Sequence, residues 1–87
     1  MSNHASAAKR ARQSIKRTER NRAIRTRVRN AVKAARVAIA SGDKGAALDP
    51  VKKASVALAR AVTQGIMRKE TASRTISRVQ SALAKLG

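Results

Sequence analysis

The basic stretch over residues 9–36 limits the possible folds of this chain more than any other feature. It contains twelve of the 21 Lys and Arg residues, a single acid (Glu19), and neither Gly nor Pro. Because the stretch is uninterrupted and rich in Ala and Arg, which favour helix, it predicts one long helix over residues 6–41. Gly42 can supply the left-handed backbone position that commonly follows a helix end.

The two halves of this expected helix differ in their apolar residues. In the second half, apolar side chains repeat at helical spacing and form a stripe about 100° wide, which is typical of a face packed on other helices. The stripe consists of Ile24, Val28, Ala31, Val32, Ala35 and Ile39. Five cations cluster on the opposite side: Arg22, Arg25, Arg29, Lys33 and Arg36.

Upstream of Ile24 the stripe stops. The positions that would continue it carry Arg10, Arg17 and Arg20, so residues 9–20 are basic on every side. A helix that is polar all round has no core to pack against, and its like charges repel one another. We therefore expect the first half of the helix to be surrounded by a polyanion.

A second helix is expected over residues 44–64, where Asp43 can act as the N-cap and Gly65 as the C-terminal stop. Pro50 leaves two alternatives open. Either the helix is interrupted near Pro50, or residues 43–48 form a single turn and the helix begins at Asp49. Its expected apolar side consists of Leu48, Val51, Ser55, Leu58, Ala61 and Val62.

A third helix is expected over residues 68–86, with basic residues on the face opposite its apolar one. The apolar face consists of Ala72, Ile76, Val79, Leu83 and Leu86. Three amphipathic helices joined by short loops predict an all-α fold, a three-helix antiparallel bundle. We expect a single domain over residues 1–87, with the long, basic N-terminal helix projecting beyond the bundle.

The overall charge of the chain indicates its class of partner. A formal net charge of +17 and a pI of 12.0 favour a polyanion such as nucleic acid. Only sixteen residues are Val, Ile or Leu and none is aromatic, so the chain can bury little apolar surface. We therefore expect marginal stability for the free protein and ordering on its partner.

The residues needed for catalysis or metal binding are scarce. The four acids are scattered, His4 is the only histidine, and there is no Cys and no Gly-rich phosphate loop. We therefore expect no enzymatic activity, no metal, no cofactor and no small-molecule substrate. We also expect no homo-oligomer. No apolar run approaches the length of a membrane span, and we expect no membrane contact.

The absence of Phe, Tyr and Trp limits how this chain can bind nucleic acid. Modules that bind single strands stack bases on aromatic side chains, which this chain lacks. Its contacts must come mainly from Arg and Lys to phosphates, with Ser, Thr, Asn and Gln reaching sugars and phosphates. This pattern favours recognition of a folded, largely double-stranded shape.

The order of residues also resembles a known family. Its marks are Asn3, Ser6-Ala7-Ala8-Lys9-Arg10, Arg12-Gln13-Ser14, Lys16-Arg17, Asn21 and Arg25, then Ala38-Ile39, Gly42-Asp43-Lys44, Gly65, Lys69, Ala72 and Arg74. Over essentially its whole length, the chain resembles bacterial small-subunit ribosomal protein twenty. The resemblance implies a three-helix bundle in the cytoplasmic 30S subunit that binds 16S ribosomal RNA directly and early in assembly. It also implies that the first helix threads between RNA helices of the 5′ domain, near the long penultimate 3′ helix.

The resemblance implies a set of RNA-binding residues. These are Ser6, Lys9, Arg10, Gln13, Ser14, Lys16, Arg17, Asn21 and Arg25, and in the third helix Lys69, Arg74 and Arg78. The basic first helix adds Arg12, Arg20, Arg22, Arg29 and Lys33, and the corner between the second and third helices adds Arg68. The chain departs from the family at Pro50, and at Glu70, where many members carry Asn.

Three other interpretations also fit parts of the sequence. A histone-like protein that compacts DNA would share the Ala-, Lys- and Arg-rich helices, although the chain has no minor-groove motif. A cationic helix on a membrane surface would need more apolar residues than Ile15 alone within residues 9–20. An organelle transit peptide would need the same missing apolar face.

Overall fold

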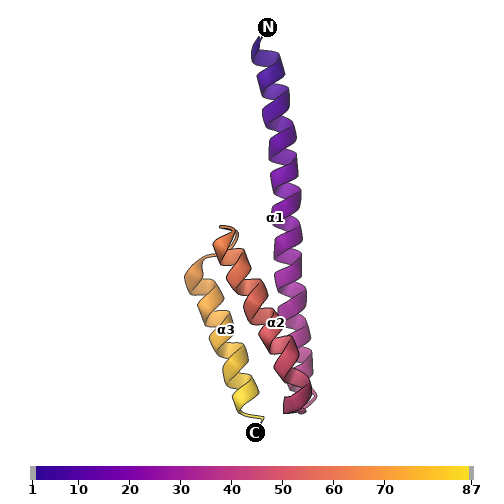
Figure 1. Ribbon diagram of the computed structural model, residues 1–87, viewed down its shortest axis with the longest axis vertical. Coiled ribbons are helices and arrows are strands. Elements are labelled where there is room, and N and C mark those ends of the chain that lie inside the picture. The colour runs from indigo at the N-terminus through magenta and orange to yellow at the C-terminus, as the bar shows by residue number, and fades with distance from the viewer. Residues whose placement is uncertain (1, 87) are drawn as a thin grey trace.

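The computed structural model describes residues 2–86, and places the side chains of residues 5–86. Three helices make up this part of the chain: α1 (Ser2–Ala40), α2 (Lys44–Thr63) and α3 (Lys69–Ala84). The two short helices lie beside the C-terminal half of α1, and the other half of α1 extends alone (Figure 1). The prediction of an all-α fold with a long N-terminal helix is confirmed.

Helix α1 is longer than the sequence pattern predicts. It begins at Ser2 rather than at residue 6, because Ala5, Ala7 and Ala8 favour helix. Its 39 residues span about 58 Å, close to the 67 Å longest dimension of the molecule. The helix ends at Ala40, one residue before the predicted end.

The predicted turn after α1 is confirmed at Gly42, whose φ of 81° lies in the left-handed region. The Gly42 N–H donates to the Ile39 carbonyl at 3.0 Å, which satisfies a carbonyl at the helix end. Asp43 then caps α2, since its carboxylate accepts from the Ala46 N–H at 3.2 Å. This tight connection reverses the chain and lays α2 against α1.

The predicted interruption of the second helix near Pro50 is wrong, as is the alternative start at Asp49. Helix α2 runs unbroken through Pro50. A proline at this position removes one hydrogen bond, the bond to the Ala46 carbonyl. Its neighbours Ala47 and Val51 are both buried, so packing holds the turns on either side of Pro50 in line.

The apolar face of α2 also differs from the prediction at Leu48, which is 54% exposed. The buried residues of this helix are Ala47, Val51, Ala54, Leu58 and Ala61. They alternate in steps of four and three residues, the spacing of a helix that packs along its neighbour. Every second buried position is Ala, and such small side chains let the axes of α1 and α2 approach closely.

The corner between α2 and α3 is closed by Gly65, with a φ of 74°. The Gly65 N–H donates to the Val62 carbonyl at 3.0 Å, and the Ile66 N–H donates to the Ala61 carbonyl at 2.9 Å. This pair of bonds is a Schellman motif. Ile66 and Met67 lie at this corner and pack half-buried against the core.

Helix α3 is shorter than the predicted range of residues 68–86, and a hydrogen-bonded turn follows its end at Ala84. Ala72 and Val79 are buried, and Ile76 and Leu83 are half-buried.

One core cluster joins all three helices, and it includes the predicted α1 stripe. Leu58 on α2, at 1% exposure, is its largest fully buried side chain. Helix α2 packs along both α1 and α3, whereas α1 and α3 contact each other much less. The core therefore covers only the C-terminal half of α1.

Candidate nucleic-acid interface

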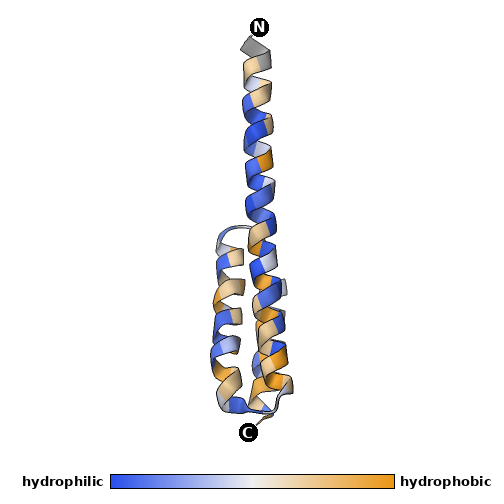
Figure 2. Ribbon diagram, turned by 90° about the vertical axis from the view of Figure 1, so that its right-hand side faces the viewer, coloured by the Kyte–Doolittle hydropathy of each residue, from blue (hydrophilic) through white to orange (hydrophobic). Residues whose placement is uncertain are grey.

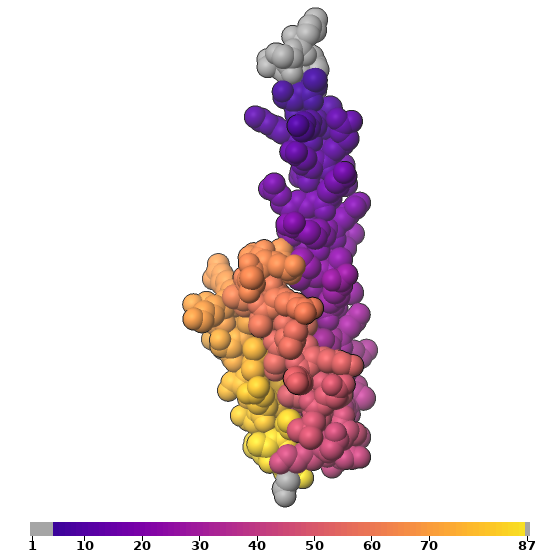
Figure 3. All heavy atoms as spheres, viewed as in Figure 1, coloured from indigo at the N-terminus to yellow at the C-terminus, as the bar shows by residue number. Residues whose placement is uncertain are grey.

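Residues 5–20 of α1, which we call the arm, are all exposed. No other helix lies beside the arm in Figure 3, and its ribbon is mainly hydrophilic in Figure 2. Its predicted RNA-binding cations are Lys9, Arg10, Arg12, Lys16, Arg17 and Arg20. Ile15 is its one large apolar side chain, at 59% exposure. No other helix among residues 2–86 therefore packs against the arm.

The charge of the arm is not balanced within the part of the chain that the structure describes. Among those residues the one ion pair is between Lys53 and Asp49 on α2, at 3.1 Å. Both side chains are largely exposed, so this pair contributes little to stability. Glu19 is the only acid of the arm and forms no salt bridge among the described residues. The positive field of the arm is therefore available to an external anion.

Gln13 lies between the basic groups of the arm. It lines one shallow hollow with Lys16, Arg17 and Arg20, and a second hollow with Lys9, Arg12 and Lys16. Each hollow combines an amide with at least three cations, a set that suits a sugar–phosphate backbone. Nearby, the Thr18 hydroxyl donates to the Ser14 carbonyl at 2.9 Å, while the Ser14 side chain stays exposed.

Asn21 marks the junction between the arm and the bundle. It is half-buried, unlike the preceding arm residues, and Ile24 one turn later is buried. The Asn21 Oδ1 atom is shielded from solvent and has no hydrogen-bond partner among the described residues. A shielded amide oxygen without a donor is costly, so this predicted site residue is poorly satisfied in the free protein.

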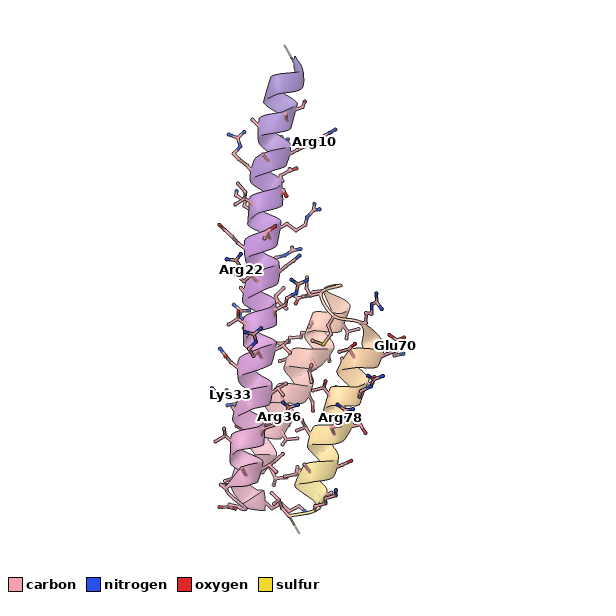
Figure 4. All side chains as sticks on the ribbon, turned by 180° about the vertical axis from the view of Figure 1, so that it is seen from behind. Arg10, Arg22, Lys33, Arg36, Glu70 and Arg78 are labelled. Atoms are coloured by element: carbon pink, nitrogen blue, oxygen red, sulfur yellow. The ribbon has the colours of Figure 1, made fainter. Side chains whose placement is uncertain are left out.

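The remaining predicted site residues lie at the base of the arm and on the bundle. Arg22, Arg25, Arg29 and Lys33 are exposed on α1, and Arg68, Lys69, Arg74 and Arg78 are exposed on the corner and on α3. Arg10 on the arm and Arg22 at its base point in different directions (Figure 4). The basic surface thus continues from the arm onto the bundle.

The structure adds Arg36 to the candidate site. Arg36 lines a groove on the bundle together with Arg29 and Lys33, and it shares a neighbouring hollow with Arg78 of α3. In the sequence, Arg36 falls on the same basic face of the first helix as Arg29 and Lys33. Its proximity to Arg78 depends on how α3 packs, and the periodicity of a single helix cannot predict that packing.

The described residues also bear on two other kinds of site, a metal site and a membrane span. Within the described part of the chain no three His, Cys, Asp or Glu residues come together in a group that could hold a metal ion. The side chain of His4 lies outside the described side chains. No helix among residues 2–86 is long and apolar enough to cross a membrane.

Comparisons with known proteins agree over nearly the whole chain. The model of the family "Ribosomal protein S20" matches residues 2–84. The small ribosomal subunit protein bS20 of Campylobacter fetus is 56% identical over 86 residues, which cover 99% of this chain and 98% of the relative. The proteins of the same name from Campylobacter jejuni serotype O:23/36 and Helicobacter pylori Shi470 are 50% and 48% identical. Each alignment covers 99% of this chain, and 99% and 97% of the relative, respectively.

Proposed function

Because this chain belongs to the ribosomal protein S20 family, we propose that it binds 16S ribosomal RNA directly and stabilises the folded RNA during assembly of the small subunit. The family is a structural, non-enzymatic component of the small ribosomal subunit. The partner of the chain is therefore that subunit, and its place is at the ribosome. The direct contact with 16S RNA is the step that we propose here.

The exposure of the arm is the observation that carries this proposal. A helix is about 10–12 Å wide with its side chains, so cations on all sides of the arm can reach RNA backbones on opposite sides of it. Arg suits this role because its planar guanidinium donates to two phosphate oxygens at once. We propose that the arm lies between RNA helices of the 5′ domain, near the penultimate 3′ helix.

The proposed contacts extend from the arm onto the bundle. The arm and its base contribute Ser6, Lys9, Arg10, Arg12, Gln13, Ser14, Lys16, Arg17, Arg20, Asn21, Arg22 and Arg25. The bundle contributes Arg29, Lys33, Arg68, Lys69, Arg74 and Arg78. In this arrangement the bundle fixes the direction of α1, and the arm neutralises phosphates where RNA helices approach one another.

Neutralising phosphates releases counterions, which makes affinity depend on salt. With about ten phosphates contacted, the logarithm of affinity should fall against the logarithm of salt concentration with a slope of about −7 to −9. A slope of about −2 would mean that the arm does not engage the RNA.

A competition experiment tests the proposal. Labelled 5′-domain 16S RNA is bound to the protein at about 0.15 M salt, where long-range electrostatics are screened. Excess unrelated duplex RNA and duplex DNA then compete for the protein. We expect the complex to survive both competitors. Equal competition by all three nucleic acids would favour a histone-like, nonspecific function instead.

A triple substitution tests the role of the arm and its base. Replacing Arg10, Arg17 and Arg25 by Ala should weaken binding by at least about a hundredfold, because three charge-assisted bonds are lost. The matched control replaces Lys44, Lys52 and Arg60, three exposed cations of α2, by Ala. The control has the same net charge, so equal losses in both variants would mean that total charge, rather than the arm, determines affinity.

A further inference from the structure

A groove runs along the bundle between α1 and α3. It is open to solvent and has a volume of about 510 Å³. Its floor contains Val28, Val32 and Leu58, and its α1 side carries Arg29, Lys33 and Arg36. The groove exists because α2 packs against both other helices, while α1 and α3 contact each other only sparsely. The bundle therefore keeps an apolar floor open beside a row of cations.

The groove continues into a smaller hollow of about 190 Å³. Arg36 and Ala40 line both, so we call the two together the α1/α3 groove. In the hollow, Arg36 from α1 and Arg78 from α3 lie at the same level of the bundle (Figure 4). The remaining lining of the hollow is apolar, including Ile39 and Val79.

No acid neutralises these two arginines among the described residues. Neither Arg36 nor Arg78 forms a salt bridge there. Glu70, on the same helix as Arg78, is eight residues away, about 12 Å along the axis. Two guanidinium cations that line one hollow repel each other, although water weakens this repulsion because both side chains are exposed. A single anion between them would turn this repulsion into two attractions, strengthened by the apolar floor.

The cations along α1 extend this site in one direction. Arg29, Lys33 and Arg36 are spaced by four and three residues, so they follow one side of the helix over about 10 Å. Along the axis of double-stranded DNA each strand carries one phosphate per about 3.4 Å, so the cation row is long enough to meet a few successive phosphates. The row continues upstream through Arg25 and Arg22 to the arm.

We propose that the α1/α3 groove holds a segment of RNA backbone, and that Arg36 there joins the RNA contacts proposed above for Arg29, Lys33 and Arg78. One phosphate lies between Arg36 and Arg78, Arg29 and Lys33 hold its neighbours, and sugar or base faces lie on the apolar floor. The inference rests on the proposed function and assigns a role to Arg36. Charge complementarity and continuity with the basic surface of the arm favour RNA over an acidic peptide as the occupant.

The bridging phosphate would also connect α3 to α1 and close the bundle on the RNA. Substituting Gln for both arginines should therefore not destabilise the free protein but should weaken its binding to RNA. Arg36→Gln with Arg78→Gln should leave the thermal midpoint of the free protein equal or higher, because a repulsion is removed. The same variant should bind 5′-domain RNA roughly tenfold to hundredfold more weakly, since two charge-assisted bonds are lost.

Occupancy of the groove can be measured directly, because the 87 residues contain no native Cys. Thr75, which lines the groove from α3, is replaced by Cys, and its alkylation rate is followed in the full-length protein with and without 5′-domain RNA. The control is Val56→Cys, on an exposed position of α2. We expect RNA to protect Thr75→Cys but not Val56→Cys, and the double Gln substitution to abolish this protection.

The possible results separate this inference from the proposed function. If the unsubstituted protein does not bind 5′-domain RNA selectively, the proposed function itself fails. If it does bind, but the double Gln variant matches a Lys44→Gln, Lys52→Gln control in affinity, the groove does not bind RNA. Equal alkylation of Thr75→Cys with and without RNA would overturn the inference as well. So would protection by a polyglutamate peptide at concentrations where RNA gives none, because the occupant would then be an acidic peptide.

Discussion

Asn21 shows at the scale of one residue how the arm and the bundle meet. Its shielded Oδ1 atom has no partner among the described residues, and a buried unsatisfied acceptor costs about 1–3 kcal/mol. Asn21→Leu should therefore increase the free energy of unfolding of the free protein by about 1 kcal/mol. The same substitution should weaken RNA binding, because the amide is a proposed RNA contact. Urea unfolding and RNA titration measure the two effects.

The matched control for Asn21 is Asn30→Leu, since Asn30 is exposed on the same helix. Exposed substitutions usually change stability by less than about 0.5 kcal/mol. If both variants gained the same stability, the gain would come from leucine in a helix and not from the junction. If Asn21→Leu bound RNA normally, the amide would not be a contact.

At the scale of the helix, α1 and α2 differ in how far the sequence predicts them. The apolar stripe of α1 was predictable because Ile24, Val28 and Val32 are large and recur at helical spacing. On α2, the large apolar side chain of Leu48 led to a predicted apolar face that includes it. In the structure Leu48 is exposed, and Ala47 and Ala54 occupy the buried positions. Ala fits both a core and a surface, so an Ala-rich helix leaves its orientation undetermined until its partner is known.

The continuity of α2 at Pro50 also depends on packing against neighbouring helices, which the local sequence does not reveal. Local rules predict a break at proline, but the burial of Ala47 and Val51 keeps α2 continuous. The candidate site likewise has a part that the sequence predicts and a part that depends on packing. The exposure of the arm follows from the lack of an apolar stripe, whereas the meeting of Arg36 and Arg78 depends on the placement of two distant segments.

The continuity of α2 leads to a prediction about Pro50. Proline inside a helix is about 3 kcal/mol less favourable than Ala, and part of that cost is offset because proline restricts the unfolded chain. Pro50→Ala should therefore raise the free energy of unfolding by about 2 kcal/mol. Urea unfolding followed by circular dichroism measures the change, with Lys52→Ala on the same helix as the control. A loss of stability would mean that α2 requires the proline, for instance to begin correctly.

At the scale of the whole molecule, charge and core size act in opposite directions. The net charge of +17 disfavours a compact state, while the core consists mostly of Ala and Val around one fully buried Leu58. Domains of this length typically have about 4–13 kcal/mol of stability, and such a core places this chain at the low end. A polyanion removes the repulsion and binds the folded state preferentially, so RNA and the bundle should stabilise each other.

Leu58→Ala tests this coupling. Removing a buried Leu costs roughly 2–5 kcal/mol, enough to unfold most of a marginally stable free protein. RNA at about one hundred times its dissociation constant stabilises the folded form by about 2.7 kcal/mol, because it binds that form. Circular dichroism should therefore show low helicity for the free variant and recovery when 5′-domain RNA is added. Val56→Ala, on an exposed position of the same helix, should retain helicity without RNA. If Leu58→Ala stayed folded and cooperative without RNA, the free bundle would be more stable than its small core suggests, and ordering on the partner would not be needed.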